Sequence, residues 1–152
     1  MSLQQEVEIL RQIPLFAKLE PAKLKLLAFT SQRLAFEPGQ VLFNQGEAGD
    51  SAYIVIDGEA EVSINTPTGR ITVATIGRNA IIGEIAILCD VPRTATVTAK
   101  AKLLTLRIDK DTFFRLITEF PQMAVEIMRE LAHRLEQTNQ QLRAAVAVAR
   151  ST

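Results

Sequence analysis

The chain is poor in the residues that most often carry catalysis or hold a metal. Its 152 residues include one cysteine, Cys89, and one histidine, His133. A single cysteine excludes an internal disulfide, and we expect Cys89 to be a buried structural thiol. A single histidine excludes the three-histidine centre of a jelly-roll metalloenzyme such as a cupin, and no nucleophile and base stand out. We therefore expect no enzyme activity, no metal and no cofactor.

Charge of one sign and long hydrophobic runs are also missing. The 17 lysines and arginines balance the 17 aspartates and glutamates. This balance argues against broad binding to nucleic acid or to an anionic membrane. No apolar run approaches the ~20 residues of a membrane span, and the N-terminus does not resemble a signal peptide. We expect one cytoplasmic domain over residues 1–152, with no nucleic-acid or membrane partner for this chain.

Periodicity divides the chain into three zones, of which the first two suggest the fold. Residues 4–30 favour two short helices, the second beginning at Pro21. Residues 31–108 favour short half-buried strands, because apolar and polar residues alternate over 60–64, 94–99 and 104–108. Turn residues separate these strands at 38–39, 46–50, 57–58, 67–69 and 77–79. Short strands separated in this way suggest a sandwich, a barrel or a jelly roll. We expect an α+β fold: a β-roll, or jelly-roll-like antiparallel β-barrel, flanked by N-terminal helices and a long C-terminal helix.

Residues 109–149 form the third zone and return to helix. Asp109 can cap a short helix at the backbone of Thr112, and Pro121 begins the long helix. The seam positions along this helix, apolar except for one threonine, are spaced by alternating steps of four and three residues, as in a coiled coil. They are Ala124, Met128, Leu131, Leu135, Thr138, Leu142, Ala145 and Ala149. We expect a homodimer seam after Leu135, because little chain remains to cover that edge; packing on the chain's own roll is the alternative.

The segment 82–97 combines groups that suit an anion carrying a sugar hydroxyl. Gly83 lets the backbone approach a ligand closely, and a short helix starting after it offers free N–H groups. Arg93 presents a fork of donors that fits phosphate oxygens. Glu84 can accept a hydrogen bond from a hydroxyl. The residues alone leave an alternative open, in which Glu84 and Arg93 pair only to close a turn.

The same segment resembles the phosphate-binding cassette of the cyclic-nucleotide-binding domain family. This family includes bacterial catabolite activators and the regulatory subunits of cyclic-nucleotide-dependent kinases. The cassette positions are filled by Gly83, Glu84, Ala86, Ile87, Arg93, Thr94, Ala95 and Val97. Further matching positions lie upstream, namely Leu10, Pro14, Leu15, Phe16, Leu19, Leu42, Phe43, Gly46, Gly49, Asp50, Tyr53, Ile54, Val55 and Gly58. The resemblance covers about residues 10–142, and two signatures in the right order make it specific.

The resemblance implies how the phosphate and sugar would be held. Glu84 would accept the ribose 2′-hydroxyl, and Arg93 would pair with the cyclic phosphate. The backbone N–H groups of Ile85, Ala86 and Thr94, with the Thr94 hydroxyl, would complete the phosphate cradle.

The resemblance also implies where the base would lie. Ala95 would keep the strand thin beside the ligand, and Val73 would wall the purine together with Ala74 and Ile82. Base contacts on the last helix fall at Arg134, Thr138 and Asn139. Thr138 can accept from an adenine amino group, and Asn139 offers both a donor and an acceptor, but both also suit an ordinary helix surface.

We expect a regulatory sensor that binds cAMP and couples binding to movement of the C-terminal helix, an allosteric step in signal transduction. A threonine after the cassette arginine also resembles cGMP-dependent kinases, so Thr94 leaves cGMP open. An alternative is the sensor half of a transcription regulator without its DNA-binding domain, since only Ser151 and Thr152 follow Arg150. The output partner protein is not identified by the sequence.

Overall fold

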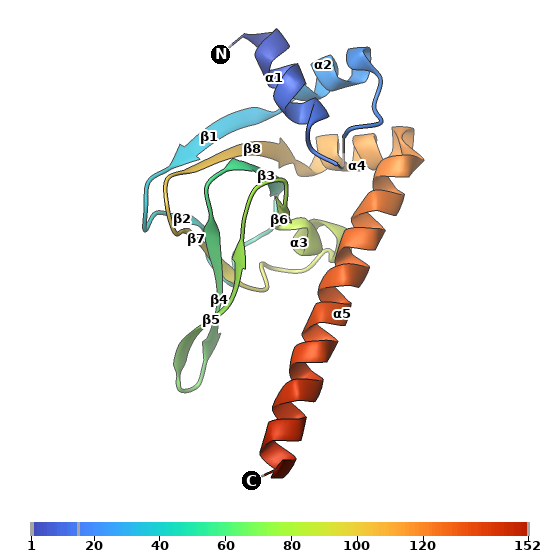
Figure 1. Ribbon diagram of the computed structural model, residues 1–152. Coiled ribbons are helices and arrows are strands. Elements are labelled where there is room, and N and C mark those ends of the chain that lie inside the picture. The colour runs from blue at the N-terminus through green and yellow to red at the C-terminus, as the bar shows by residue number, and fades with distance from the viewer. Residues whose placement is uncertain (1, 15, 152) are drawn as a thin grey trace. The chain divides into compact units, whose positions relative to one another are not determined.

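The structure is a computed structural model that describes residues 2–14 and 16–151. Leu15, which belongs to the matching positions near the N-terminus, lies outside the described residues. The chain forms two compact units, Met1–Arg115 and Leu116–Thr152 (Figure 1). The first unit contains the two N-terminal helices and the strands, and the second contains the long C-terminal helix.

Two helices open the first unit, as the sequence predicts. Helix α1 (Leu3–Arg11) begins with a capping box, in which the Ser2 hydroxyl accepts from the Gln5 N–H and the Gln5 side chain accepts from the Ser2 N–H. Helix α2 (Pro21–Thr30) has its proline in the first turn, where no backbone donor is lost. The apolar sides of the two helices are buried at Val7, Leu10, Leu24, Leu27 and Ala28.

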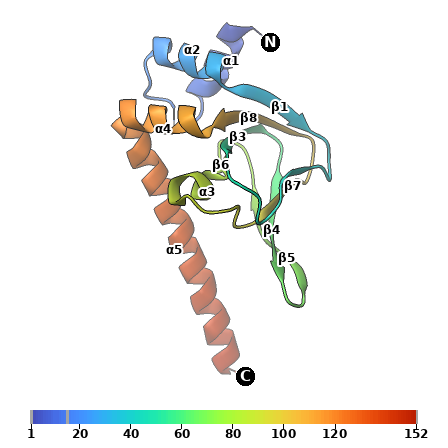
Figure 2. The ribbon, with the colours of Figure 1, turned by 180° about the vertical axis from the view of Figure 1, so that it is seen from behind.

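Eight strands follow and form two four-stranded antiparallel sheets. The strands are β1 (Gln32–Phe36), β2 (Val41–Phe43), β3 (Ser51–Asp57), β4 (Ala60–Thr66), β5 (Gly69–Ile76), β6 (Ile81–Ile82), β7 (Thr96–Ala99) and β8 (Leu103–Asp109). The strand orders are β1-β8-β3-β6 and β2-β7-β4-β5. The predicted β-roll is therefore confirmed, in the form of two separate sheets. Both ribbon views show the β4–β5 hairpin extending away from the other strands (Figures 1 and 2).

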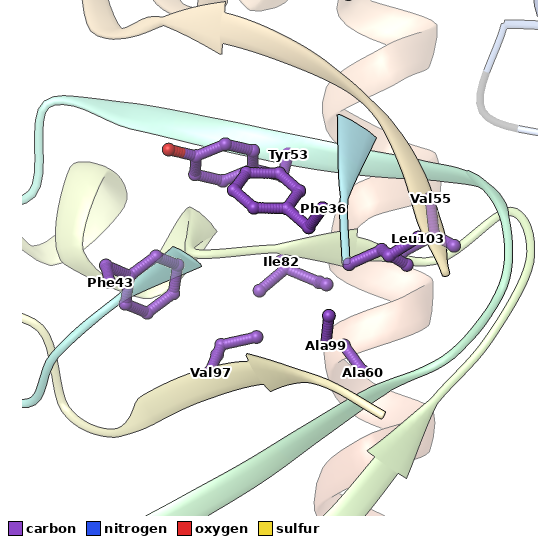
Figure 3. Close-up of a cluster of buried hydrophobic side chains, with 9 residues drawn as sticks. All are labelled: Phe36, Phe43, Tyr53, Val55, Ala60, Ile82, Val97, Ala99 and Leu103. Atoms are coloured by element: carbon purple, nitrogen blue, oxygen red, sulfur yellow. The ribbon is translucent and has the colours of Figure 1, made fainter. Parts of the chain in front are cut away.

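The two sheets share one apolar core, drawn in Figure 3. Its buried members come from strands of both sheets and are Phe36, Phe43, Tyr53, Val55, Ala60, Ile82, Val97, Ala99 and Leu103. This follows from alternation, because every second residue of a strand faces the same side of its sheet. The core cluster includes three aromatic rings. The Tyr53 ring lies between the other two, with its centroid 6.2 Å from that of Phe36 and 6.0 Å from that of Phe43.

Strand β7 departs from the predicted alternation. It begins at Thr96, two residues later than expected, and Thr96 is buried instead of facing outward. Burial of its hydroxyl is tolerated because Oγ1 accepts a hydrogen bond from the Gln45 N–H at 2.9 Å. Thr105 in β8 is buried in the same way, and its hydroxyl donates to the Leu34 carbonyl at 3.1 Å.

A short helix, α3 (Glu84–Cys89), lies between β6 and β7. Its buried positions are Glu84, Ala86 and Ile87. Cys89 is the last helical residue and is exposed, so the prediction of a buried thiol was wrong. The reason is the helical phase, since the buried residues of α3 occupy the side away from Cys89.

Two helices complete the chain. Helix α4 (Lys110–Glu119) is capped as predicted, with the Thr112 N–H donating to Asp109 Oδ1 at 2.8 Å. Helix α5 (Pro121–Ser151) begins at the predicted proline. Its seam residues Met128, Leu135 and Leu142 are exposed. Within the described part of the chain, no helix combines the length and apolarity needed to cross a bilayer.

Candidate functional site

Gly83 sits at the junction between β6 and α3. It is the N-cap of α3, and its φ of 85° lies in the left-handed region that favours glycine. A Cβ atom at this position would collide with Nη1 of Arg93. Glycine is therefore required here both by the backbone conformation and by the approach of the Arg93 side chain.

Arg93 is the central polar residue of the site, and it is 3% exposed. Its Nη1 donates to the Gly83 carbonyl at 2.9 Å, and its Nη2 donates to the Ser51 carbonyl at 2.7 Å. Its Nε is buried and finds no acceptor among the described residues. A guanidinium has five N–H donors, so two carbonyls leave several of them for a further acceptor.

The main chain of Arg93 is held as firmly as its side chain. The Arg93 N–H donates to the Glu47 carbonyl, and the Gly46 N–H donates to the Arg93 carbonyl, both at 2.8 Å. These bonds pair Arg93 with the loop between β2 and β3. The loop segment therefore fixes where the arginine enters the site.

Burial and neighbouring groups act in opposite directions on the charge of Arg93. Burial lowers the pKa of Arg93 from its ordinary value, while nearby Tyr53 and Asp50 act in the opposite direction. An arginine remains a cation at neutral pH despite such a shift. Arg93 forms an ion pair with Asp50, at 3.8 Å between Nη2 and Oδ1, and the Asp50 side chain is 75% exposed.

The other predicted residues of the first unit fall into buried and exposed groups. Glu84 and Ala86 are buried in α3, whereas Ile85 and Thr94 are exposed and Ala95 is half-buried. Val73 and Ala74 are exposed on β5, an edge strand. Ile82 lies in the core cluster between the sheets. The structure thus brings Gly83 and Arg93 into direct contact. The remaining cassette residues are neighbours of these two residues in the sequence.

The predicted base-contacting residues lie on α5, in the second unit. Arg134 Nη2 forms an ion pair with Glu130 at 2.8 Å. The Thr138 hydroxyl donates to the Arg134 carbonyl at 2.9 Å, and Asn139 follows it on the helix. A hydroxyl that donates in this way still has lone pairs to accept with. That these side chains meet a nucleotide base stays a prediction.

Sequence reasoning did not assign Phe43, Asp50 or Ser51 to the site. The Arg93 guanidinium carbon lies over the Phe43 ring, 4.0 Å from its centroid. Ser51 contributes a main-chain carbonyl, so its residue type carries no signal. Asp50 also pairs with Arg107 at 3.4 Å, and its place in the upstream signature was the available sequence signal.

Metal binding has no support in the described residues, where no group of three or more histidine, cysteine, aspartate or glutamate side chains could hold an ion.

The fold and the buried arginine are those of a cyclic-nucleotide-binding domain. The family model described as "Cyclic nucleotide-binding domain" matches residues 33–120, and the chain belongs to this family. The resemblance drawn from the cassette is therefore confirmed. The family defines a regulatory domain that binds a cyclic nucleotide.

Relatives with different outputs share this domain. The chain is 32% identical over 136 residues to a CRP-like cAMP-activated global transcriptional regulator of Mycobacterium tuberculosis, covering 89% of this chain and 61% of that protein. It is 41% identical over 108 residues to a cAMP-dependent protein kinase regulatory subunit of Yarrowia lipolytica, covering 71% and 28%. The catabolite activator protein of Thermus thermophilus has a TM-score of 0.74 at 28% identity, over 85% of this chain and 61% of that one. The chain thus spans less than two thirds of these relatives.

Proposed function

We propose that this chain is a non-catalytic sensor that binds cAMP in preference to cGMP and changes the position of its C-terminal helix in response. The observation that supports this most directly is the buried guanidinium of Arg93. It is held by two carbonyls, and its Nε has no acceptor among the described residues. A buried cation with unused donors fits a small, singly charged anion such as a cyclic phosphate.

The remaining contacts follow from the residues next to Arg93. The backbone N–H groups of Ile85, Ala86 and Thr94 and the Thr94 hydroxyl complete the phosphate cradle. Glu84, 1% exposed, accepts the ribose 2′-hydroxyl. A carboxylate buried this deeply is stabilised by accepting hydrogen bonds, which a sugar hydroxyl can donate.

The choice of cAMP depends on the base. Thr138 and Asn139 offer acceptors to the adenine amino group, and Val73 offers apolar surface to the ring. The Mycobacterium tuberculosis relative is named as cAMP-activated, and the Yarrowia lipolytica relative belongs to a kinase named as cAMP-dependent. Thr94 is exposed beside Arg93, where it also suits guanine, so cGMP is the competing ligand.

Ligand binding is coupled to the C-terminal helices by a shift between two states. A ligand moves such an equilibrium only by binding one state more tightly. The first residue of α4, Lys110, contacts the site's surroundings twice: its N–H donates to the Asp50 carbonyl at 2.9 Å, and its Nζ lies 3.4 Å from Asp90 at the end of α3. A rearrangement around Arg93 therefore reaches α4 through direct contacts.

The partner that receives the movement of the C-terminal helix is a second copy of the chain or another protein. The exposed seam residues Leu135 and Leu142 support a homodimer through α5. The Mycobacterium tuberculosis relative supports equally well the alternative that the chain is the sensor part of a transcription regulator. The coding sequence on either side of this chain would decide between a homodimeric sensor and the sensor part of a transcription regulator. The single-domain organisation, the cytoplasmic location and the unidentified partner protein stay predictions.

Calorimetry with cAMP and cGMP tests the proposal on the full chain. The wild type is expected to bind cAMP more tightly than cGMP. Arg93→Ala should weaken cAMP binding by about a hundredfold or more, because it removes a buried hydrogen-bonded charge. Arg93→Lys keeps the charge but loses the fork of donors, so it should bind with intermediate affinity.

Arg78→Ala is the matched control. Arg78 is an exposed arginine of the same roll that pairs with Asp57 at 2.9 Å, so its removal should leave the affinity unchanged. Equal weak binding by wild type and Arg93→Ala would count against the assigned pocket. Tighter binding of cGMP would keep the pocket and reverse the proposed nucleotide.

A further inference from the structure

The Arg93 guanidinium has a neighbour whose role in the site is not assigned by the cassette motif. The ring of Phe43, the last residue of β2, lies under the guanidinium carbon at 4.0 Å from its centroid. Phe43 is 8% exposed, so this contact is largely shielded from water. A cation over an aromatic face is attracted by the negative charge of that face, most strongly where water is excluded.

We propose that Phe43 is a positioning residue that orients Arg93 for the cyclic phosphate. This proposal rests on the proposed function, and it adds a determinant of affinity that does not touch the nucleotide.

The geometry explains why a third support is needed. The donors of a guanidinium lie in its plane, so the Gly83 and Ser51 carbonyls restrain two directions within that plane. They leave the faces of the group unrestrained. The Phe43 ring covers one face and limits rotation out of the plane. The Nε donor is thereby kept in one direction, and preorganised donors cost less ordering when an anion binds.

The ring is itself held in place. Phe43 packs against Tyr53, with centroids 6.0 Å apart and ring planes at 31°, and Tyr53 packs against Phe36. Phe43 also pairs with Val97 across β2 and β7. Figure 3 shows the Phe43 ring at the end of this buried cluster. A support that is fixed by the core can restrain a mobile side chain, whereas an exposed ring could not.

The segment that follows Phe43 supplies several of the other contacts that hold Arg93, and the Gly83 carbonyl supplies a further one. The loop after Phe43 pairs with the Arg93 main chain at Gly46 and Glu47, and it ends in Asp50 and the Ser51 carbonyl. Phe43 supplies the one apolar contact in this set.

Phe43→Leu tests the proposal, because it keeps an apolar side chain and removes the aromatic face. The full chain with this substitution should bind cAMP about tenfold more weakly by calorimetry, the effect of one desolvated cation–aromatic contact. Phe36→Leu is the matched control. Phe36 is 9% exposed and belongs to the same core cluster, and its recorded ring contact is with Tyr53. Its substitution should cost similar stability in urea and leave the affinity within about twofold.

A second measurement makes the result independent of nucleotide binding. The NMR signal of the Arg93 Nε–H, recorded on the ligand-free chain, should move when the ring is removed and should exchange faster with water. Phe36→Leu should leave this signal in place. If the wild type binds neither nucleotide, the proposed function fails, and the Nε–H signal still decides whether Phe43 orients the arginine.

Two outcomes overturn the positioning role. One is a Phe43→Leu protein with wild-type affinity and an unmoved Nε–H signal. The other is an equal loss of affinity in Phe43→Leu and Phe36→Leu at equal loss of stability, which would mean that the core as a whole, and not the ring beneath Arg93, sets the affinity.

Discussion

At the scale of single residues, Gly83 combines a backbone constraint with a steric one. Gly83→Ala places a Cβ atom against Nη1 of Arg93 at a φ of +85°. We expect a loss of about 1–3 kcal/mol in the free energy of unfolding from the left-handed conformation. We also expect at least tenfold weaker cAMP binding, because the guanidinium must move. Urea unfolding and calorimetry measure the two effects.

Gly39→Ala separates these two effects. Gly39 has nearly the same φ, +86°, and an added Cβ would find open space. It should therefore lose stability like Gly83→Ala but keep wild-type affinity. If Gly83→Ala also bound cAMP normally, the contact between Gly83 and Arg93 would be irrelevant to the site.

The cassette was predicted from a family resemblance, and burial was predicted from local alternation. The types and order of Gly83, Glu84 and Arg93 alone left a turn-closing ion pair as an alternative, and the resemblance to a family, which is confirmed, decided between the two. The roles of these residues toward a nucleotide stay predictions. Thr96 was placed wrongly because its burial depends on a partner that is distant in sequence, and Cys89 because of the phase of the short helix α3. The burial of the Thr96 hydroxyl is satisfied by the N–H of Gln45, two residues after the end of β2. Local alternation contains no information about such a partner.

At the scale of elements, Asp109 links the last strand to the first C-terminal helix. Its carboxylate accepts from the Thr112 N–H, and this bond is the main cause that lowers the pKa of Asp109 from 3.8. Asp109→Ala should reduce the free energy of unfolding by about 1 kcal/mol at neutral pH, the usual value of an N-cap. Asp111→Ala, in the first turn of the same helix, is the control and should cost less.

The difference in the free energy of unfolding between wild type and Asp109→Ala depends on pH, and the lowered pKa of Asp109 gives the direction of that dependence. A carboxyl whose pKa is lowered in the folded state stabilises that state above its unfolded pKa, near 3.8. The contribution is lost as the pH falls through the folded value. The difference between wild type and Asp109→Ala should therefore be constant from pH 7 to about pH 5 and shrink in acid. A difference that grows on acidification would contradict the cap assignment.

Element types were predictable, and element details were not. Alternation over 60–64 and the turn residues Pro67 to Gly69 located β4 and its end, whereas no alternating run announced β5. The same pattern gave no sign of the register shift between Val62 and Ser63. A two-residue strand such as β6 is too short for any period to be detected. The end of α3 was not predictable either, because the left-handed residue that ends it is Asp90 and not a glycine.

At the scale of the whole molecule, the sequence predicted the order of helices and sheets and the family, but not how the parts respond to a ligand. Period and turn residues are local, so they identify each zone from its own residues. The proposed coupling between the cassette and the C-terminal helices rests on contacts such as that of Lys110 with Asp50 and Asp90, which join residues far apart in the chain. Such contacts become visible only when the strands are paired.

At the same scale, the sequence predicts that two copies of the chain assemble through α5. Leu142 lies on the coiled-coil seam of α5 and is 61% exposed. A seam that is apolar at every third or fourth residue gains stability by pairing with a second helix, and a charge placed within it would lose its hydration without a partner. Leu142→Asp should therefore convert a dimer to a monomer in sedimentation velocity. Gln140→Asp adds the same charge to the exposed surface of the same helix outside the seam, and it should leave the dimer intact. A wild-type monomer, or a Leu142→Asp protein that sediments as the wild-type dimer does, would show that α5 does not join two copies, and the output would then have to pass to another protein.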